Sequence, residues 1–134
     1  MTEIQTKLFS AACEAQKRAH APYSGALIGA AVLMTDGKIF SGCNVENASY
    51  GGTVCAERVA IFKAISEGAT KKISEVLVVS DAESPWPPCG FCRQVMAEFA
   101  DEKTVVHITN LQGKIKSFQF TQLFPEAFTP SHLD

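Results

Sequence analysis

The spacing of hydrophobic positions changes several times along the chain, and each change predicts a new element. From Glu3 to His20 small and aliphatic residues recur every three or four positions, which is the spacing of an amphipathic helix. Pro22 ends this run, because proline cannot continue a helix. We therefore expect a first helix over residues 3–20.

A β-hairpin is predicted next. Residues 27–34 are almost all apolar, and residues 38–44 form a second strand-like segment. Asp36 and Gly37, between them, are a strong signal for a two-residue hairpin turn.

Two cysteine-bearing segments have helical patterns. Thr53 is suited to cap a helix that runs to Glu67 and stops at Gly68. The second predicted helix covers residues 89–100. The apolar residues expected on the inner faces of these two helices are Val59, Phe62, Ile65, Val95, Met96 and Phe99.

Three further strands are expected at residues 76–79, 104–109 and 115–120, followed by a terminal helical turn. Strands 76–79 and 105–108 should be parallel neighbours, since a helix-length connection separates them. Alternating helices and strands predict an α/β protein, a three-layer α-β-α sandwich around a five-stranded mixed sheet.

Length and charge narrow the possibilities. With 134 residues, of which 46% are hydrophobic, the chain suits one domain over residues 1–134. A net charge of −2 with interspersed signs argues against a nucleic acid polymer as partner. No apolar stretch could cross a bilayer and no leader-like start is present, so we expect no membrane partner and a cytoplasmic location.

Five cysteines leave one without a partner in any disulfide scheme, which favours reduced thiols or metal ligation. Cys13 and Cys43 have apolar neighbours and are expected to be buried core thiols.

The other three cysteines predict a catalytic zinc site. Cys55, Cys89 and Cys92 could hold Zn²⁺ and leave its fourth position to water, while Glu57 moves that water's proton. Helix starts at Cys55 and Cys89 would favour their thiolate forms. Two alternatives stay open: a structural zinc site closed by Cys43, and a C-x-x-C redox pair.

Arg58 is expected to donate to the cysteine sulfurs. Three thiolates on one dication leave a net charge of −1, which weakens the ion as a Lewis acid, and a guanidinium would offset this charge. The alternatives are a solvated Arg58 and a solvated first-turn Glu57.

The spacing is close to the signature of zinc deaminases, and the chain resembles the small, homotetrameric, three-cysteine cytidine deaminases over nearly its whole length. The resemblance is carried by residues 21–24, 42–48, 55–58, 88–94 and 123–128. It implies hydrolytic deamination of cytidine and deoxycytidine to uridine and deoxyuridine, with ammonia release, in pyrimidine salvage. It also implies that Glu57 passes protons to N3 of the pyrimidine and to the leaving amine.

The substrate contacts follow partly from spacing and partly from this resemblance. Asn44 and Glu46 are two apart at a strand end, so their side chains share a face and suit ribose hydroxyls. A turn-stabilising Asn and an exposed Glu are the alternative. By resemblance, the backbone of Ala56 reads the base, and Tyr50 and Phe128 complete sites of neighbouring subunits. Ordinary packing in the core or at an interface is the alternative for both rings.

Ala26 departs from the family, whose members generally have phenylalanine there, packed against the pyrimidine. Trp86 or Phe91 could supply the missing surface, or the pocket could admit cytosines with a larger N4 or C5 substituent. A one-residue shift at Leu27 or Ile28 could instead fill the space.

Two rival functions share parts of this pattern. A deaminase of a cytosine-bearing antibiotic such as blasticidin S would keep the zinc motif. A zinc-stabilised interaction module, the non-enzymatic rival, would need a closed metal site and would tolerate loss of Glu57.

Overall fold

A computed structural model describes residues 1–134, and its elements follow the predicted order. In chain order they are α1 (Glu3–Gln16), β1 (Ile28–Met34), β2 (Ile39–Cys43), the 3₁₀ turn η1 (Tyr50–Gly52), α2 (Ala56–Ser66), β3 (Ile73–Ser80), α3 (Gly90–Phe99), β4 (Val105–Asn110), β5 (Ile115–Gln119), α4 (Phe120–Leu123) and the 3₁₀ turn η2 (Pro130–Leu133). The longest helix, α1, has 14 residues, and no helix combines the length and apolar character that a membrane crossing requires.

The five strands form one mixed sheet in the order β2-β1-β3-β4-β5. The predicted parallel neighbours are confirmed, since β3 and β4 run parallel with Val76 opposite Val106. All other neighbours are antiparallel. The predicted hairpin is also confirmed: β1 and β2 join through a turn in which Gly37 has a φ of 87°, a conformation that favours glycine.

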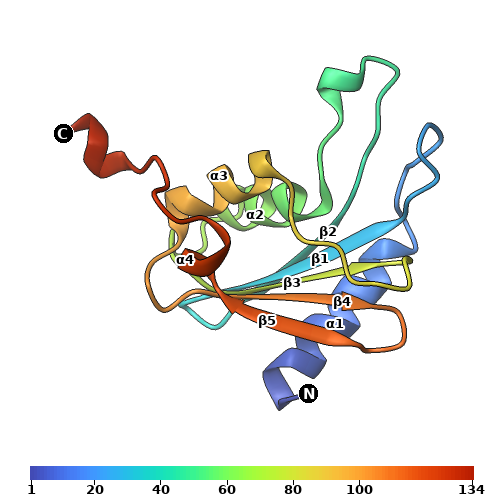
Figure 1. Ribbon diagram of the computed structural model, residues 1–134, viewed down its shortest axis with the longest axis horizontal. Coiled ribbons are helices and arrows are strands. Elements are labelled where there is room, and N and C mark those ends of the chain that lie inside the picture. Colours follow the sequence, from blue (N-terminus) through green and yellow to red (C-terminus); the bar gives the residue numbers. More distant parts are fainter.

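Helices cover both faces of the sheet, as the sandwich prediction required (Figure 1). On one face, α1 packs on β1, β2 and β3 around Leu8 and Leu77. On the other face, α2 and α3 cover the larger core, which includes Ile61 and Met96. Cys55, Cys89 and Cys92 lie at the N-terminal ends of α2 and α3 and so belong to this second face.

Two strand glycines allow the helices to approach the sheet closely. A methyl group at Gly29 would lie 2.0 Å from the carbonyl oxygen of Ala12 in α1, and one at Gly42 would lie 2.7 Å from the backbone nitrogen of Ala60 in α2. Real side chains do not reach such distances. The two positions therefore fix the spacing between the sheet and one helix on each face.

Several predicted details are wrong. The first helix ends at Gln16, four residues early. Cys55, and not Thr53, is the N-cap of α2, because Thr53 is still extended and its hydroxyl accepts a hydrogen bond from the backbone N–H of Asn47. The inner face of α2 is also different: Phe62 is 48% exposed, and the buried residues are Ala56, Glu57, Ala60, Ile61 and Ala64.

Cys13 and Cys43 are only partly buried, so the prediction that both are buried core thiols is wrong. Cys13 is on α1, in the outer layer, and Cys43 ends the edge strand β2, so neither is enclosed on all sides. Burial is still sufficient to raise the pKa of the Cys13 thiol above its ordinary value.

Candidate active site

Two helix N-termini meet at the cysteine cluster. Cys55 is the N-cap of α2 and Cys89 is the N-cap of α3, both with extended backbone and with no side-chain capping bond. Cys92 follows in the first turn of α3 and is buried. The thiols of the two N-caps are therefore beside unpaired backbone N–H groups and the positive ends of two helix dipoles.

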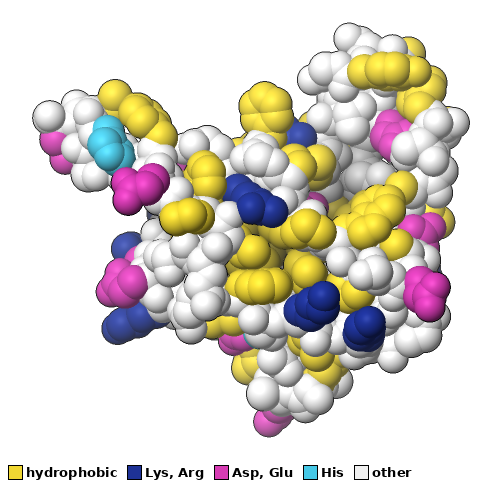
Figure 2. Space-filling model, viewed as in Figure 1, with side chains coloured by type: hydrophobic (Ala, Val, Ile, Leu, Met, Phe, Trp, Pro, Cys, Tyr) yellow, Lys and Arg dark blue, Asp and Glu magenta, His cyan; other side chains and the backbone are white.

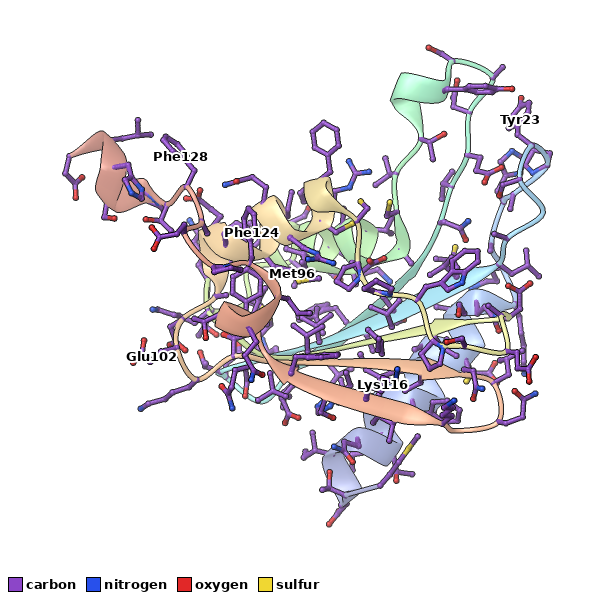
Figure 3. The ribbon with its side chains drawn as sticks, viewed as in Figure 1. Tyr23, Met96, Glu102, Lys116, Phe124 and Phe128 are labelled. Carbon is purple, nitrogen blue, oxygen red and sulfur yellow. The ribbon has the colours of Figure 1, made fainter.

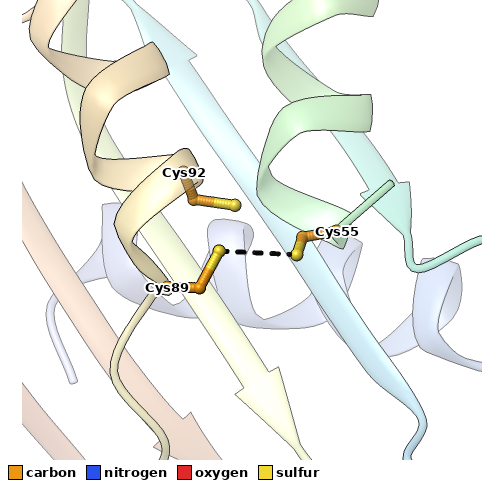
Figure 4. A group of neighbouring side chains, drawn as sticks. All are labelled: Cys55, Cys89 and Cys92. Carbon is orange, nitrogen blue, oxygen red and sulfur yellow. Dashed lines mark hydrogen bonds between the residues drawn. The ribbon is translucent and has the colours of Figure 1, made fainter. Parts of the chain in front are cut away.

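The three sulfur atoms are close enough to share one metal ion. All lie within 4.8 Å of one another, and the Cys55 and Cys89 sulfurs are 3.7 Å apart (Figure 4). A tetrahedral ion with Zn–S bonds of about 2.3 Å separates its sulfur ligands by about 3.8 Å. The arrangement thus fits Zn²⁺. Cys43 does not belong to the cluster, which argues against a structural site closed by that residue.

The thiols of Cys55 and Cys92 have pKa values shifted in opposite directions. A hydrogen bond from Cys92, with further donation from Arg58, lowers the pKa of Cys55 to about 5. The same bond to Cys55, together with burial, raises the pKa of Cys92. Cys55 is therefore the thiol that most readily exists as thiolate, and Cys92 is its donor until a metal replaces the proton.

Arg58 lies against the cluster as predicted. Its Nη2 is 3.5 Å from the Cys55 sulfur and 3.5 Å from the Thr53 carbonyl oxygen. The guanidinium carbon lies 5.4 Å from the centre of the Phe91 ring, a cation–π distance. These three contacts hold a positive charge beside the thiolate. Phe91 does not line the cavity described next.

Glu57 is buried beside the thiols. It is 4% exposed, and burial raises the pKa of its carboxyl group to about 7. The side chain lines a cavity of about 400 Å³ that also reaches Cys55 and Cys89. A carboxyl group that can carry a proton near neutral pH thus shares a small-molecule-sized cavity with the candidate metal ligands.

The cavity gathers four of the six predicted substrate contacts. Ala26, Asn44, Glu46 and Ala56 line it, whereas Tyr50 and Phe128 do not. Tyr50 packs edge-on against Tyr23, with ring centres 5.7 Å apart, in a loop at one end of the molecule. Phe128 lies on the C-terminal arm at the opposite end (Figure 3). One chain does not bring these two aromatic rings together.

Asn44 and Glu46 also hold the loop that precedes β1. The Asn44 side chain accepts from the Ile28 N–H at 2.9 Å and donates to the Ala26 carbonyl at 2.8 Å. The Glu46 carboxylate accepts from Ser24 and from the Tyr23 N–H, and the Ser24 hydroxyl keeps the pKa of Glu46 below its usual value. An amide and a carboxylate have capacity beyond these bonds, so both can still contact a ligand.

Two residues on the cavity wall bear on the gap left by Ala26. Trp86, from the proline-rich loop between β3 and α3, lines the cavity, and so does Ile28.

Ser80, at the end of β3, also lines the cavity and was not predicted from the sequence, although a polar residue at the end of an apolar strand is a usable signal. Its hydroxyl is buried and has no hydrogen-bond partner.

A three-thiol metal site with a buried glutamate, placed over the ends of two helices on a mixed sheet, defines a metal-dependent enzyme site of the zinc hydrolase type. The family profile "Cytidine and deoxycytidylate deaminase zinc-binding region" matches residues 2–108. The chain belongs to this family, and the zinc cofactor predicted from the cysteines accords with it.

Individual relatives agree with this assignment. The cytidine deaminase of Halalkalibacterium halodurans is 48% identical over 95% of this chain and 96% of its own length. That of Sporosarcina psychrophila is 45% identical over 95% of this chain and 93% of its own. The crystal structure of cytidine deaminase from Burkholderia pseudomallei is 44% identical and covers 96% of this chain and 100% of its own, with a TM-score of 0.87.

Proposed function

We propose that this protein is a zinc-dependent enzyme that hydrolytically deaminates cytidine and deoxycytidine to uridine and deoxyuridine with release of ammonia. The observation that carries the proposal is the buried Glu57 carboxyl group in one cavity with two of three clustered thiols. A purely structural zinc site has no use for such a group and usually closes all four metal positions with side chains.

In this proposal Cys55, Cys89 and Cys92 hold the zinc ion. When bound, the ion would act as a Lewis acid that makes water nucleophilic near neutral pH. Arg58 donates to the Cys55 sulfur and so reduces the negative charge that three thiolates place on the site.

Glu57 moves the protons. It accepts, one after the other, the two protons that the attacking water loses, and it delivers one to N3 of the pyrimidine and the other to the leaving amine, because its carboxyl group is buried in the same cavity. The backbone N–H of Ala56, in the first turn of α2, has no partner within the helix and reads the base. Asn44 and Glu46 bind the ribose hydroxyls with the capacity that their loop contacts leave unused.

Subunit association completes the site in this proposal. Tyr50 is 75% exposed and Phe128 is 54% exposed, and hydrophobic side chains are visible on both projecting segments of the molecule (Figure 2). A homotetramer would let each aromatic residue reach a neighbour's cavity, and light scattering of the purified protein measures the mass of the assembly directly.

We place the enzyme in the cytoplasm, since five free cysteines suit a reducing compartment, and we assign the whole reaction to one domain over residues 1–134.

The test is Glu57→Ala with zinc content and turnover measured on the same sample. Loss of general acid–base catalysis should lower the rate of ammonia release from cytidine by about 10²–10⁴-fold, while one zinc ion per chain remains. Glu67→Ala, an exposed glutamate at the other end of α2, is the matched control and should behave as wild type.

Substantial turnover by Glu57→Ala would reject the assignment. The same assay with blasticidin S separates the nucleoside enzyme from an antibiotic deaminase: the proposal expects cytidine to be the better substrate, because Asn44 and Glu46 suit a ribose. A protein that binds zinc but releases no ammonia from any of these compounds would instead be an interaction module.

A further inference from the structure

Ser80 has a buried hydroxyl that lacks a partner at the cavity wall. The residue is 1% exposed, and its Oγ has neither donor nor acceptor within reach. Other buried hydroxyls in this protein are paired: Thr104 donates to the Ile73 carbonyl at 2.8 Å, and Thr109 donates to the Val78 carbonyl at 2.9 Å. Since buried polar groups are nearly always satisfied, an unpaired one on a residue that lines a cavity points to a group that a ligand supplies.

The sheet places Ser80 away from Glu57. Glu57 lies in the first turn of α2, which packs mainly on β2 and β1, whereas Ser80 belongs to β3, on the other side of β1. Ser80 is directly opposite Ile28 in the β1–β3 pairing, so both form the sheet side of the cavity. The two polar groups thus approach a bound ring from different sides.

The role of Ser80 rests on the proposed function, which sets the orientation of a bound cytosine. N3 and C5 flank C4 on opposite sides of the ring, so a cytosine that offers N3 to Glu57 turns C5 away from α2, and β3 lies on that side of β1. We propose that the Ser80 hydroxyl is a specificity-determining group that hydrogen-bonds a polar substituent at C5, such as a hydroxymethyl group. An unmodified cytosine has only a C–H bond there and leaves the hydroxyl without a protein or substrate partner.

The cavity offers space for such a substituent. Ala26 contributes only a methyl group to the wall, and Trp86 enters from a loop and is half exposed. Neither side chain forms a hydrogen bond with the Ser80 hydroxyl, so neither competes with a ligand for it. The hydroxyl therefore remains available to a small polar group at C5.

The test compares two nucleosides whose C5 groups have nearly the same size, 5-hydroxymethylcytidine and 5-ethylcytidine. Wild-type enzyme should show a kcat/KM about tenfold higher for the hydroxymethyl compound, the effect of roughly one hydrogen bond. In Ser80→Ala this preference should disappear, because alanine offers no hydroxyl to the hydroxymethyl group. A preference that survives in Ser80→Ala, or that is absent from wild type, overturns the proposal.

Thermal unfolding separates a binding role from a structural one. Ser80→Ala removes a hydroxyl with no partner, so its Tm should equal or exceed that of wild type. Thr109→Val, the matched control, loses a bonded hydroxyl outside the cavity and should lower Tm without changing the substrate preference. A lower Tm in Ser80→Ala would show that the hydroxyl is paired in the folded protein and would overturn the proposal.

The wild-type comparison is decisive even if Ser80→Ala does not fold. Failure of wild type to deaminate cytidine would reject the proposed function. Deamination of cytidine without a preference between the two C5 compounds would reject the role of Ser80 alone.

Discussion

A single methyl group added at Gly42, in β2, should weaken zinc binding by displacing α2, the helix that carries Cys55 at its N-terminus. In Gly42→Ala the new Cβ would lie 2.7 Å from the Ala60 nitrogen, 2.9 Å from the Ala56 carbonyl oxygen and 2.9 Å from the Val59 Cβ. Ordinary contacts are at least 3.4 Å. Because two of the three atoms are backbone, the helix has to move away from the sheet as a unit.

The movement can be translated into two measurable changes. Overpacking of this kind costs about 1–3 kcal/mol, and for a chain of this length each kcal/mol lowers Tm by roughly 3–5 °C. Cys55 is joined directly to the displaced helix, whereas Cys89 belongs to α3. The 3.7 Å separation of their sulfurs should therefore change, and we expect zinc affinity to fall by about 10–100-fold.

Gly29→Ala is the control for a general loss of stability. It brings a Cβ to 2.0 Å from the Ala12 carbonyl oxygen, but on the opposite face of the sheet, against α1. Its Tm should fall at least as far, with little change in zinc affinity. Competition with a chromophoric zinc chelator and thermal unfolding in excess zinc would measure both. Equal losses of zinc affinity in the two variants would refute the reasoning.

Two further predictions concern groups away from the site. His107 is 2% exposed, with Nε2 2.7 Å from Glu75 and Nδ1 2.7 Å from Ser117. His107→Leu leaves both partners unpaired and should lower the free energy of unfolding by about 1–3 kcal/mol in urea titrations; an unchanged midpoint would contradict this. The Thr70 and Lys38 N–H groups hold the pKa of Asp36 below its usual value. The ionised Asp36 carboxylate should therefore stabilise the fold fully above about pH 4, and this stabilisation should be lost as the pH falls through the lowered pKa. The Tm of wild type should exceed that of Asp36→Asn at neutral pH, and the difference should vanish in acid. A difference that persists at about pH 2 would argue against this.

The local elements were predictable because their signals are local. The run of apolar residues around Asp36-Gly37 predicted a hairpin, and a helix-length connection predicted parallel β3 and β4; both are confirmed. The exact start of α2 was not predictable in the same way. Thr53 is a good N-cap by type, but its hydroxyl is engaged by Asn47 in a loop whose path depends on residues outside the helix.

The chemical composition of the site was also present in the sequence. The spacing of Cys55, Glu57, Cys89 and Cys92 was sufficient to predict a metal site, since few other functions use three thiols with a nearby carboxylate. Arg58 was predicted from charge balance and from its position next to Glu57, and its Nη2 lies 3.5 Å from the Cys55 sulfur.

Contacts between distant segments were decided only by the tertiary structure. Asn44 contacts the backbone of Ala26 and Ile28, and Ser80, whose hydroxyl is unpaired, lines the same cavity, because strand order and register bring three separate segments together. Nothing in the spacing of those residues specifies that meeting. By itself the sequence determined the elements, the thiols and the acid, since periodicity and residue chemistry are properties of short segments. The tertiary structure decided which wall each group occupies, because burial and unmet hydrogen bonds exist only after the chain is packed.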